Sequence, residues 1–173
     1  MKVNPSDIFS NNPIFNLFAD ELDTISNNER AMIILGHGYI ELIINVILES
    51  KYKNSNTIID ANYFKKIKKL LSDQLIDQTV FEALNWFRLL RNKAVHNFIF
   101  SFSVKTRKKM WKFIEYMAPS QKMYGKLLLK LDLKVFIYCI TGILLNKFSD
   151  IFLPLFKNFM IPFDIKDPAP SSG

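Results

Sequence analysis

The stretch that decides the fold covers residues 29–51 and reads ERAMIILGHGYIELIINVILESK. Asn27 or Asn28 just before it can cap a helix, because a short polar side chain accepts hydrogen bonds from the free N–H groups of the first turn. Apolar side chains from Met32 to Leu48 fall on nearly every side of that helix. A helix that is apolar all round is buried, so the sequence predicts that this segment lies at the centre of a helical bundle.

Four polar side chains interrupt that apolar helix along one narrow line: Arg30, His37, Glu41 and Asn45. Two interpretations of this line are open. It could face a functional site, where Glu41 would orient a histidine. It could also be a buried polar ladder whose members satisfy one another's hydrogen bonds.

We expect His37 to be structural. It lies one turn before Glu41, so a contact between the two side chains can satisfy both. It is also flanked by Gly36 and Gly38, whose lack of a side chain would let another helix pack closely.

Further helical patterns lie on both sides of this central segment. The expected helices run from Asn12-Pro13 to about Ile25, from Ala61 (capped by Asp60) to Leu71, from Asp77 to Phe98, from Val104 to Met117, from Leu131 to Phe148, and over 150–160 with an interruption at Pro154. In the helix from Ala61, we expect Phe64, Ile67, Leu70 and Leu71 to point inward and four lysines to point outward. Residues 51–59 are predicted to form a polar loop, and residues 97–103 an extended segment.

These patterns predict an all-α, antiparallel helical bundle of about five to seven helices. The chain has 173 residues, enough for one domain, and we assign residues 1–166 to it and residues 167–173 to a flexible C-terminal tail. Hydrophobic residues make up 49%, including 16 Phe, which excludes disorder for most of the chain, and the presence of only 5 Gly favours helices.

The net charge of +7 suits a polyanionic partner such as RNA, although solubility alone would explain the same excess. The lysines cluster at 65–69 and 105–112.

The single Cys139 cannot form an internal disulfide, so a reducing cytoplasm is the expected setting. The N-terminus does not resemble a signal peptide, and the apolar run Val135–Leu145 has only 11 residues, so we expect no membrane segment. No pattern typical of a metal or cofactor site is present, and we predict neither.

The run Leu90-Arg91-Asn92-Lys93-Ala94-Val95-His96-Asn97 carries the chemistry. Arg91 has a permanent, forked positive charge that can grip phosphate. His96 can give or take a proton near neutral pH, and Asn92 can hold a phosphate oxygen or a 2′-hydroxyl. This combination suits cutting an RNA phosphodiester without a metal. Alternatively, Arg91 and His96 satisfy the last carbonyls of a helix.

The spacing predicts a site completed by a second copy of the chain. On an ideal helix Asn92 and His96 share a face, whereas Arg91 and His96 lie about 140° apart. The core-facing stripe is predicted to hold Val80, Ala83, Leu84, Phe87, Leu90, Ala94 and Phe98, and the opposite face Asn85, Leu89, Asn92 and His96. A site on one helix would be loose, so we expect a homodimer in which two of these helices meet across a two-fold axis.

The signature Arg91-Asn92-x-x-x-His96 near the end of a long helix resembles that of the HEPN superfamily (higher eukaryote and prokaryote nucleotide-binding domains). Residues 30–41, RAMIILGHGYIE, resemble the second helix of the mannitol operon repressor group within it. The segments 64–67 (FKKI) and 90–96 (LRNKAVH) resemble that group's next two landmarks. The resemblance covers roughly residues 29–102.

This resemblance implies a dimeric helical bundle, and for many members a metal-independent endoribonuclease that acts as a toxin or anti-phage effector. Arg91, His96 and Asn92 would be the catalytic residues, supported by Glu41, His37 and Asn97. The partners would be RNA, a second copy and an antitoxin or other regulatory protein. The main alternative is a non-catalytic regulator resembling the mannitol operon repressor, which acts through protein partners, and nucleotide binding without cleavage is a third.

Overall fold

A computed structural model of the protein describes residues 13–52, 56–97, 99–117 and 132–159. Every regular element in these ranges is a helix, which confirms the predicted all-α bundle. The helices are α2 (Pro13–Thr24), α3 (Glu29–Lys51), α4 (Asn56–Ile59), α5 (Tyr63–Ser72), α6 (Gln78–His96), α7 (Val104–Met117), α8 (Asp132–Lys147) and α9 (Ser149–Phe159). The predicted tail, residues 167–173, lies outside the described residues.

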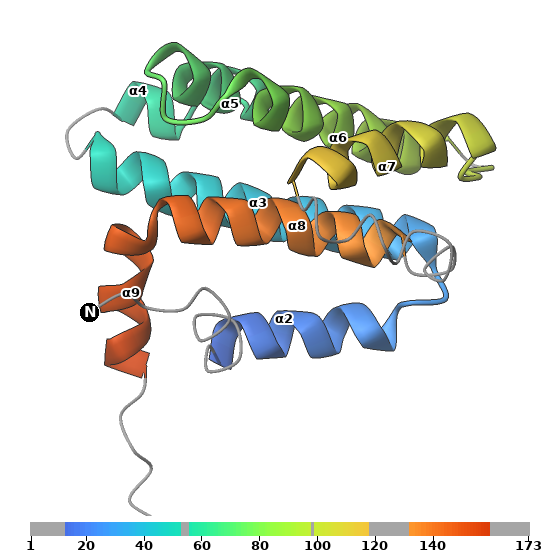
Figure 1. Ribbon diagram of the computed structural model, residues 1–173, viewed down its shortest axis with the longest axis horizontal. Coiled ribbons are helices and arrows are strands. Elements are labelled where there is room, and N and C mark those ends of the chain that lie inside the picture. Colours follow the sequence, from blue (N-terminus) through green and yellow to red (C-terminus); the bar gives the residue numbers. More distant parts are fainter. Residues whose placement is uncertain (1–12, 53–55, 98, 118–131, 160–173) are drawn as a thin grey trace, which may run out of the picture.

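The helix α3 lies at the centre of the bundle, as predicted, between α2 on one side and α5 and α6 on the other, with α8 alongside (Figure 1). Its bounds agree with the prediction, and its cap is Asn28, whose side chain accepts a hydrogen bond from the N–H of Ala31. The buried residues of α3 are Met32, Ile33, Gly36, His37, Ile40, Ile43, Ile44, Ile47 and Leu48. They join side chains of all the neighbouring long helices in one hydrophobic core.

The two glycines of α3 differ in their surroundings. Gly36 lies directly against Ile137 of α8, which confirms that a helix packs closely there. Gly38 has no neighbouring atom within 4 Å of the position that a Cβ atom would take. The prediction of close packing at Gly38 is therefore wrong, because this residue lies on the exposed side of α3.

The predictions for α4 and α5 need correction. The expected loop contains one helical turn, α4, and the cap of α5 is Asn62 rather than Asp60, with its side chain accepting from the N–H of Lys65. The helix α5 packs on α6 and α3 through a stripe of Tyr63, Lys66, Ile67 and Leu70. Lys66 is thus buried instead of outward, while Phe64 is exposed.

The bounds of α2 and α9 agree with the prediction to within about one residue. The predicted interruption at Pro154 is wrong: Pro154 lies inside α9, because a proline removes one hydrogen bond and can bend a helix without ending it. By length and apolar composition, α3 is the one described helix that could cross a membrane, and half of its most apolar stretch is buried in the bundle. Residues 133–147 and 149–155 meet the same criterion only as one span bent by 91°. The core helix of a soluble protein meets it too.

Candidate functional site

The helix α6 is held in place by its cap and its apolar stripe. The side chain of Asp77 accepts a hydrogen bond from the N–H of Val80 at 2.9 Å, which fixes the first turn. Six of the seven predicted core residues, Val80, Ala83, Leu84, Phe87, Leu90 and Ala94, are buried, and Phe98 lies outside the described residues. On the opposite face Leu89 is 46% exposed, and His96 is exposed as well. The predicted core face is confirmed, and of the predicted open face Leu89 and His96 are exposed whereas Asn85 and Asn92 are half-buried.

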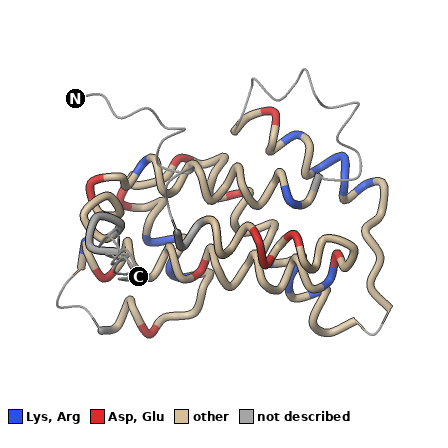
Figure 2. Tube along the Cα trace, turned by 90° about the horizontal axis from the view of Figure 1, so that it is seen from below, with Lys and Arg blue, Asp and Glu red and all other residues tan. Residues whose placement is uncertain are grey.

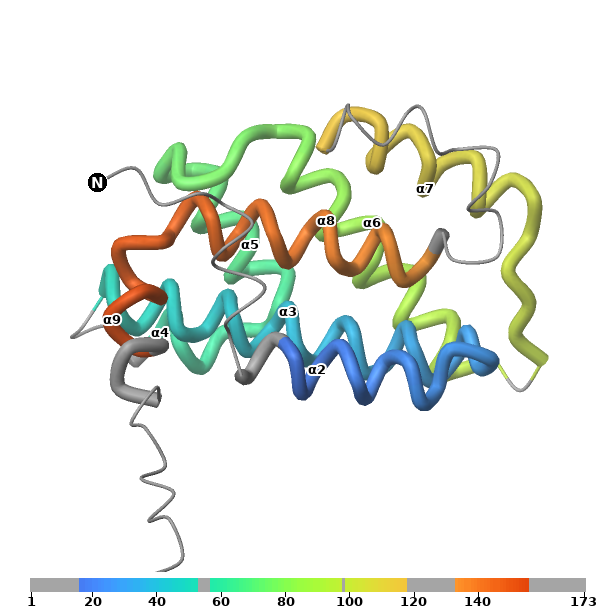
Figure 3. The backbone as a smooth tube through the Cα atoms, turned by 60° about the horizontal axis from the view of Figure 1, so that its bottom comes forward, coloured from blue at the N-terminus to red at the C-terminus, as the bar shows by residue number. Residues whose placement is uncertain are grey.

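An open groove of about 860 Å³ lies where α6 ends and α7 begins. Figure 3 shows the connection between these helices, residues 99–103, at one end of the bundle. Three of the predicted site residues line the groove: Asn92, His96 and Asn97. Asn97 also ends α6, because its N–H donates to the carbonyl of Lys93.

The remaining groove residues supply positive charge and flat apolar surface. The lysines are Lys93, Lys105 and Lys109, and the aromatic side chains are Trp86 and Phe100. Trp86 is fixed from behind by ring contacts with Phe113 of α7 and Phe136 of α8. The groove therefore combines a histidine, two amides, cationic side chains and aromatic rings.

Arg91 lies between the groove and α3. Its Nη1 donates to Oδ1 of Asn92 at 3.4 Å, a long hydrogen bond. On its other side its charge acts on His37 of α3. Arg91 and His96 share no hydrogen bond in the described part of the chain, which agrees with their expected angular separation on one helix. Asn92 therefore connects Arg91 to the groove.

His37 is buried between α3, α5 and α6, with its ring 4.4 Å from that of Tyr63. Burial, followed by the positive charges of Arg91 and Arg88, lowers the pKa of His37 to about 4. The imidazole is therefore neutral near pH 7. Its Nδ1 lies 3.8 Å from Oε2 of Glu41, which is too long for a hydrogen bond, so the expected mutual satisfaction of this pair is not made.

The other members of the polar line on α3 find partners on neighbouring helices. The ammonium of Lys66 donates to Oδ1 of Asn45 at 2.8 Å, and Nη2 of Arg30 donates to the carbonyl of Val95 at 3.3 Å. Neither His37 nor Glu41 lines the groove beside His96. The line thus acts mainly as a set of contacts from α3 to α5 and α6, and this favours the structural interpretation.

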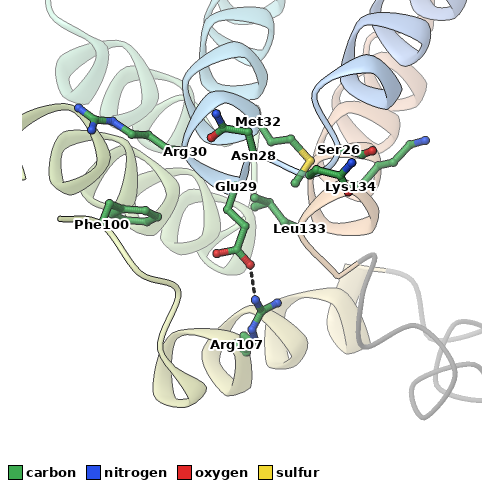
Figure 4. Close-up of a pocket in the computed structure, with 10 residues that line it drawn as sticks. Ser26, Asn28, Glu29, Arg30, Met32, Phe100, Arg107, Leu133 and Lys134 are labelled. Carbon is green, nitrogen blue, oxygen red and sulfur yellow. Dashed lines mark hydrogen bonds and ion pairs between the residues drawn. The ribbon is translucent and has the colours of Figure 1, made fainter. Parts of the chain in front are cut away.

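A second pocket, of about 420 Å³, lies at the start of α3 (Figure 4). It is lined by residues 26–30, Met32, Phe100, Arg107, Leu133 and Lys134. Its cations already have partners, since Arg107 pairs with Glu29 and Lys134 pairs with Asp23. Phe100 lines both this pocket and the groove. Sequence reasoning missed the pocket because its walls come from four distant segments.

Other chemistry is poorly supported in the part of the chain that the structure describes. No group of three His, Cys, Asp or Glu side chains there could hold a metal ion. Burial raises the pKa of the Cys139 thiol to about 11, so the thiolate needed for nucleophilic attack is scarce at neutral pH.

The fold and the groove define an all-helical bundle protein with an open site at the end of α6. Residues 39–150 match the family described as "Domain of unknown function (DUF4145)". This match covers more than half of the chain, which therefore belongs to that family. It spans most of α3 and all of α6, α7 and α8. Neither a curated protein nor a solved structure matches the chain.

Proposed function

We propose that the protein is a metal-independent endoribonuclease of the HEPN type, which cleaves RNA to 2′,3′-cyclic phosphate ends in the cytoplasm. The observation that carries this proposal is the groove in which exposed His96 lies beside two amides, three lysines and two aromatic rings. Lysines neutralise the RNA backbone, and aromatic faces stack with unpaired bases. The signature resemblance supports a role as a toxin or anti-phage effector restrained by an antitoxin.

In the proposed reaction the 2′-hydroxyl attacks the adjacent phosphorus, so that the P–O2′ bond forms as the P–O5′ bond breaks. His96 takes the proton of the 2′-hydroxyl as general base, or gives one to the leaving 5′-oxygen as general acid. Asn92 holds a phosphoryl oxygen, and Arg91 neutralises the charge that develops on the phosphoryl group.

The reaction removes one proton and donates another, and two histidines would serve these two steps best. The groove of one copy contains one histidine, His96. A two-fold dimer through the open face of α6 would supply the second. Leu89, at the middle of that face, is the apolar side chain that such a contact would cover. Arg91 of one copy would then approach His96 of the other, which overcomes their separation around a single helix.

The test is incubation of the purified protein with mixed RNA in EDTA, beside His96→Ala. We expect cleavage that leaves cyclic phosphate ends and is lost in His96→Ala. His37→Ala is the matched control, because it removes the other histidine of the chain at a place outside the groove. Cleavage that survives in His96→Ala, or an inactive wild type, would contradict the proposal.

A non-catalytic regulator that acts through a protein partner is the second candidate. Ile99, which lines the groove, and Val104, the first residue of α7, are 86% and 70% exposed. Clustered exposed apolar side chains are typical of protein contacts. For a regulator, the EDTA assay shows no cleavage, and Ile99→Ser with Val104→Ser weakens binding of the partner while His96→Ala does not.

A further inference from the structure

The helix α7 presents a basic face to solvent. It buries Met110, Phe113 and Ile114 in the core. Its opposite side carries four exposed lysines, Lys105, Lys108, Lys109 and Lys112, which we call the basic face of α7. Glu115 is the one acidic residue in this helix. In Figure 2, the Lys and Arg positions of α7 are the blue segments of the helix at the upper right.

The lysines of the basic face are not committed to ion pairs. In the described residues, no carboxylate lies within 4.0 Å of any of these four ammonium groups. Their neighbour Arg107, on the flank of the same helix, is by contrast paired with Glu29. Lys109 lies over the ring of Phe113 at 5.9 Å, a contact that leaves its charge without a carboxylate. Lysines without a carboxylate partner are available to an external anion.

The basic face is continuous with the groove. Lys105 and Lys109 belong to both surfaces, since they also line the groove that holds His96. Lys108 and Lys112 lie farther along α7, and the row ends at Tyr116, whose side chain is 54% exposed. At a rise of about 1.5 Å per residue, the row from Lys105 to Tyr116 is roughly 16 Å long.

We propose that single-stranded RNA leaving the groove runs along the basic face of α7, where Lys108 and Lys112 bind its phosphates and Tyr116 stacks on a base. This inference rests on the proposed function for the identity of the strand, and it adds a binding surface outside the cleavage site. The flat faces of Trp86, Phe100 and Tyr116 are accessible only to unpaired bases, which favours a single strand over a duplex.

The burial of α7 favours RNA over an anionic membrane. A helix that binds at a membrane surface inserts an apolar face between the lipids. The apolar face of α7 is occupied by the core, and Val104 is its only exposed aliphatic residue. Apart from Val104, the exposed side of α7 carries mainly charged side chains and the ring of Tyr116.

The test measures binding without cleavage. Fluorescent RNA with 2′-O-methyl groups, which lacks the attacking hydroxyl, is titrated by anisotropy into wild type and into the double variant Lys108→Gln/Lys112→Gln. Two lengths of about 4 and about 12 nucleotides distinguish the groove from the extended surface. The matched control is Lys65→Gln/Lys68→Gln, which removes the same charge from exposed positions on α5.

We expect the α7 variant to bind the longer RNA more weakly and with a shallower salt dependence, while the shorter RNA is unaffected. Losing two phosphate contacts reduces the slope of log K against log salt by about 1.4. Between about 50 and 200 mM salt, wild type would then lose roughly sevenfold more affinity than the variant. Because the RNA cannot be cut, this result is independent of whether the protein is a nuclease.

Three outcomes would overturn the inference. One is an equal change in slope for the α5 control, which would indicate a response to net charge alone. Another is an equal loss for both RNA lengths, or no binding of either. The third is tighter binding of vesicles rich in phosphatidylserine than of RNA, with the same dependence on Lys108 and Lys112.

Discussion

Gly36 of α3 lies directly against Ile137 of α8. A Cβ atom placed on Gly36 would lie 2.6 Å from Cδ1 and 3.0 Å from Cγ1 of Ile137. Ile137 is fully buried, so its side chain has little space into which to move. This contact sets how closely α8 approaches α3.

Alanine at the two glycines of α3 should therefore have opposite effects on stability. We expect Gly36→Ala to lower the free energy of unfolding by about 1–3 kcal/mol through overpacking. Gly38→Ala should raise it by about 0.5–1 kcal/mol, because alanine favours the helix and no atom lies within 4 Å. Urea titrations followed by circular dichroism measure both. Ile137→Val should partly rescue Gly36→Ala by removing Cδ1, and a stabilised Gly36→Ala would show that α8 is not packed as described.

Lys66 is 6% exposed, and its ammonium donates to Asn45. Asn45→Ala leaves a buried charge without this acceptor, and we expect a loss of about 1.5–3 kcal/mol in the free energy of unfolding. The double variant Asn45→Leu/Lys66→Met removes both polar groups and should be closer to wild type than Asn45→Ala is. Additive losses in a double-mutant cycle of these positions would argue against their coupling.

The stability of the protein should depend on pH through His37. The folded protein protonates this residue at about pH 4 and the unfolded chain near pH 6.5. Below pH 6.5 the unfolded chain binds more protons, so the free energy of unfolding falls as pH is lowered from 6.5 to 4, by roughly 3 kcal/mol in total. Above pH 6.5 this contribution is constant. Denaturation across this range should show a flatter profile for His37→Gln than for wild type.

Arg91→Lys separates the two candidate functions. If the protein is a nuclease, lysine keeps the charge but loses the planar grip on phosphate, and we expect cleavage to fall by roughly 10²–10³ while the fold survives. If the protein is a regulator, the same change lowers the melting temperature or weakens the dimer. RNA cleavage and thermal melting are measured on the same preparation. Unchanged behaviour in both would show that Arg91 has no role in either.

Leu89→Asp should prevent the proposed dimer. Near the two-fold axis it places two like charges close together, and it replaces an exposed apolar side chain that contributes little to the fold of a single copy. We expect a dimer for wild type by light scattering at micromolar concentration, a monomer for Leu89→Asp, and loss of cleavage with the dimer. Leu17→Asp on α2, another exposed leucine, is the control and should remain dimeric. A monomeric wild type would exclude a composite site.

The sequence predicted the long helices well because their apolar periodicity and caps are local. The bounds of α3 and α7 agree with the pattern, as does the core face of α6. The predicted start of α5 was wrong. Asp60 and Asn62 are both good caps, and only the packing of Tyr63 and Lys66 into the core distinguishes the two possible starts. Gly36 and Gly38 look alike in the sequence, and only the position of α8 separates them.

The candidate site was predictable in part for the same reason. Asn92, His96 and Asn97 are close in sequence and share a groove, so a local motif finds them. The wall contributed by Lys105 and Lys109 depends on the path of the connection from α6 to α7, which local patterns do not fix. Arg91 donates a hydrogen bond to its neighbour Asn92 but does not line the groove itself, which the local motif does not reveal.

The central position of α3 has a consequence for synthesis of the chain. Gly36 meets Ile137, which is translated 101 residues later. At roughly 5–20 residues per second, α3 is complete roughly 5–20 s before α8 can cover it. Until α6 is made and packs on it, this 23-residue helix is exposed on the growing chain with apolar side chains on most of its faces. We therefore expect the incomplete chain to be most prone to aggregation before α6 is complete.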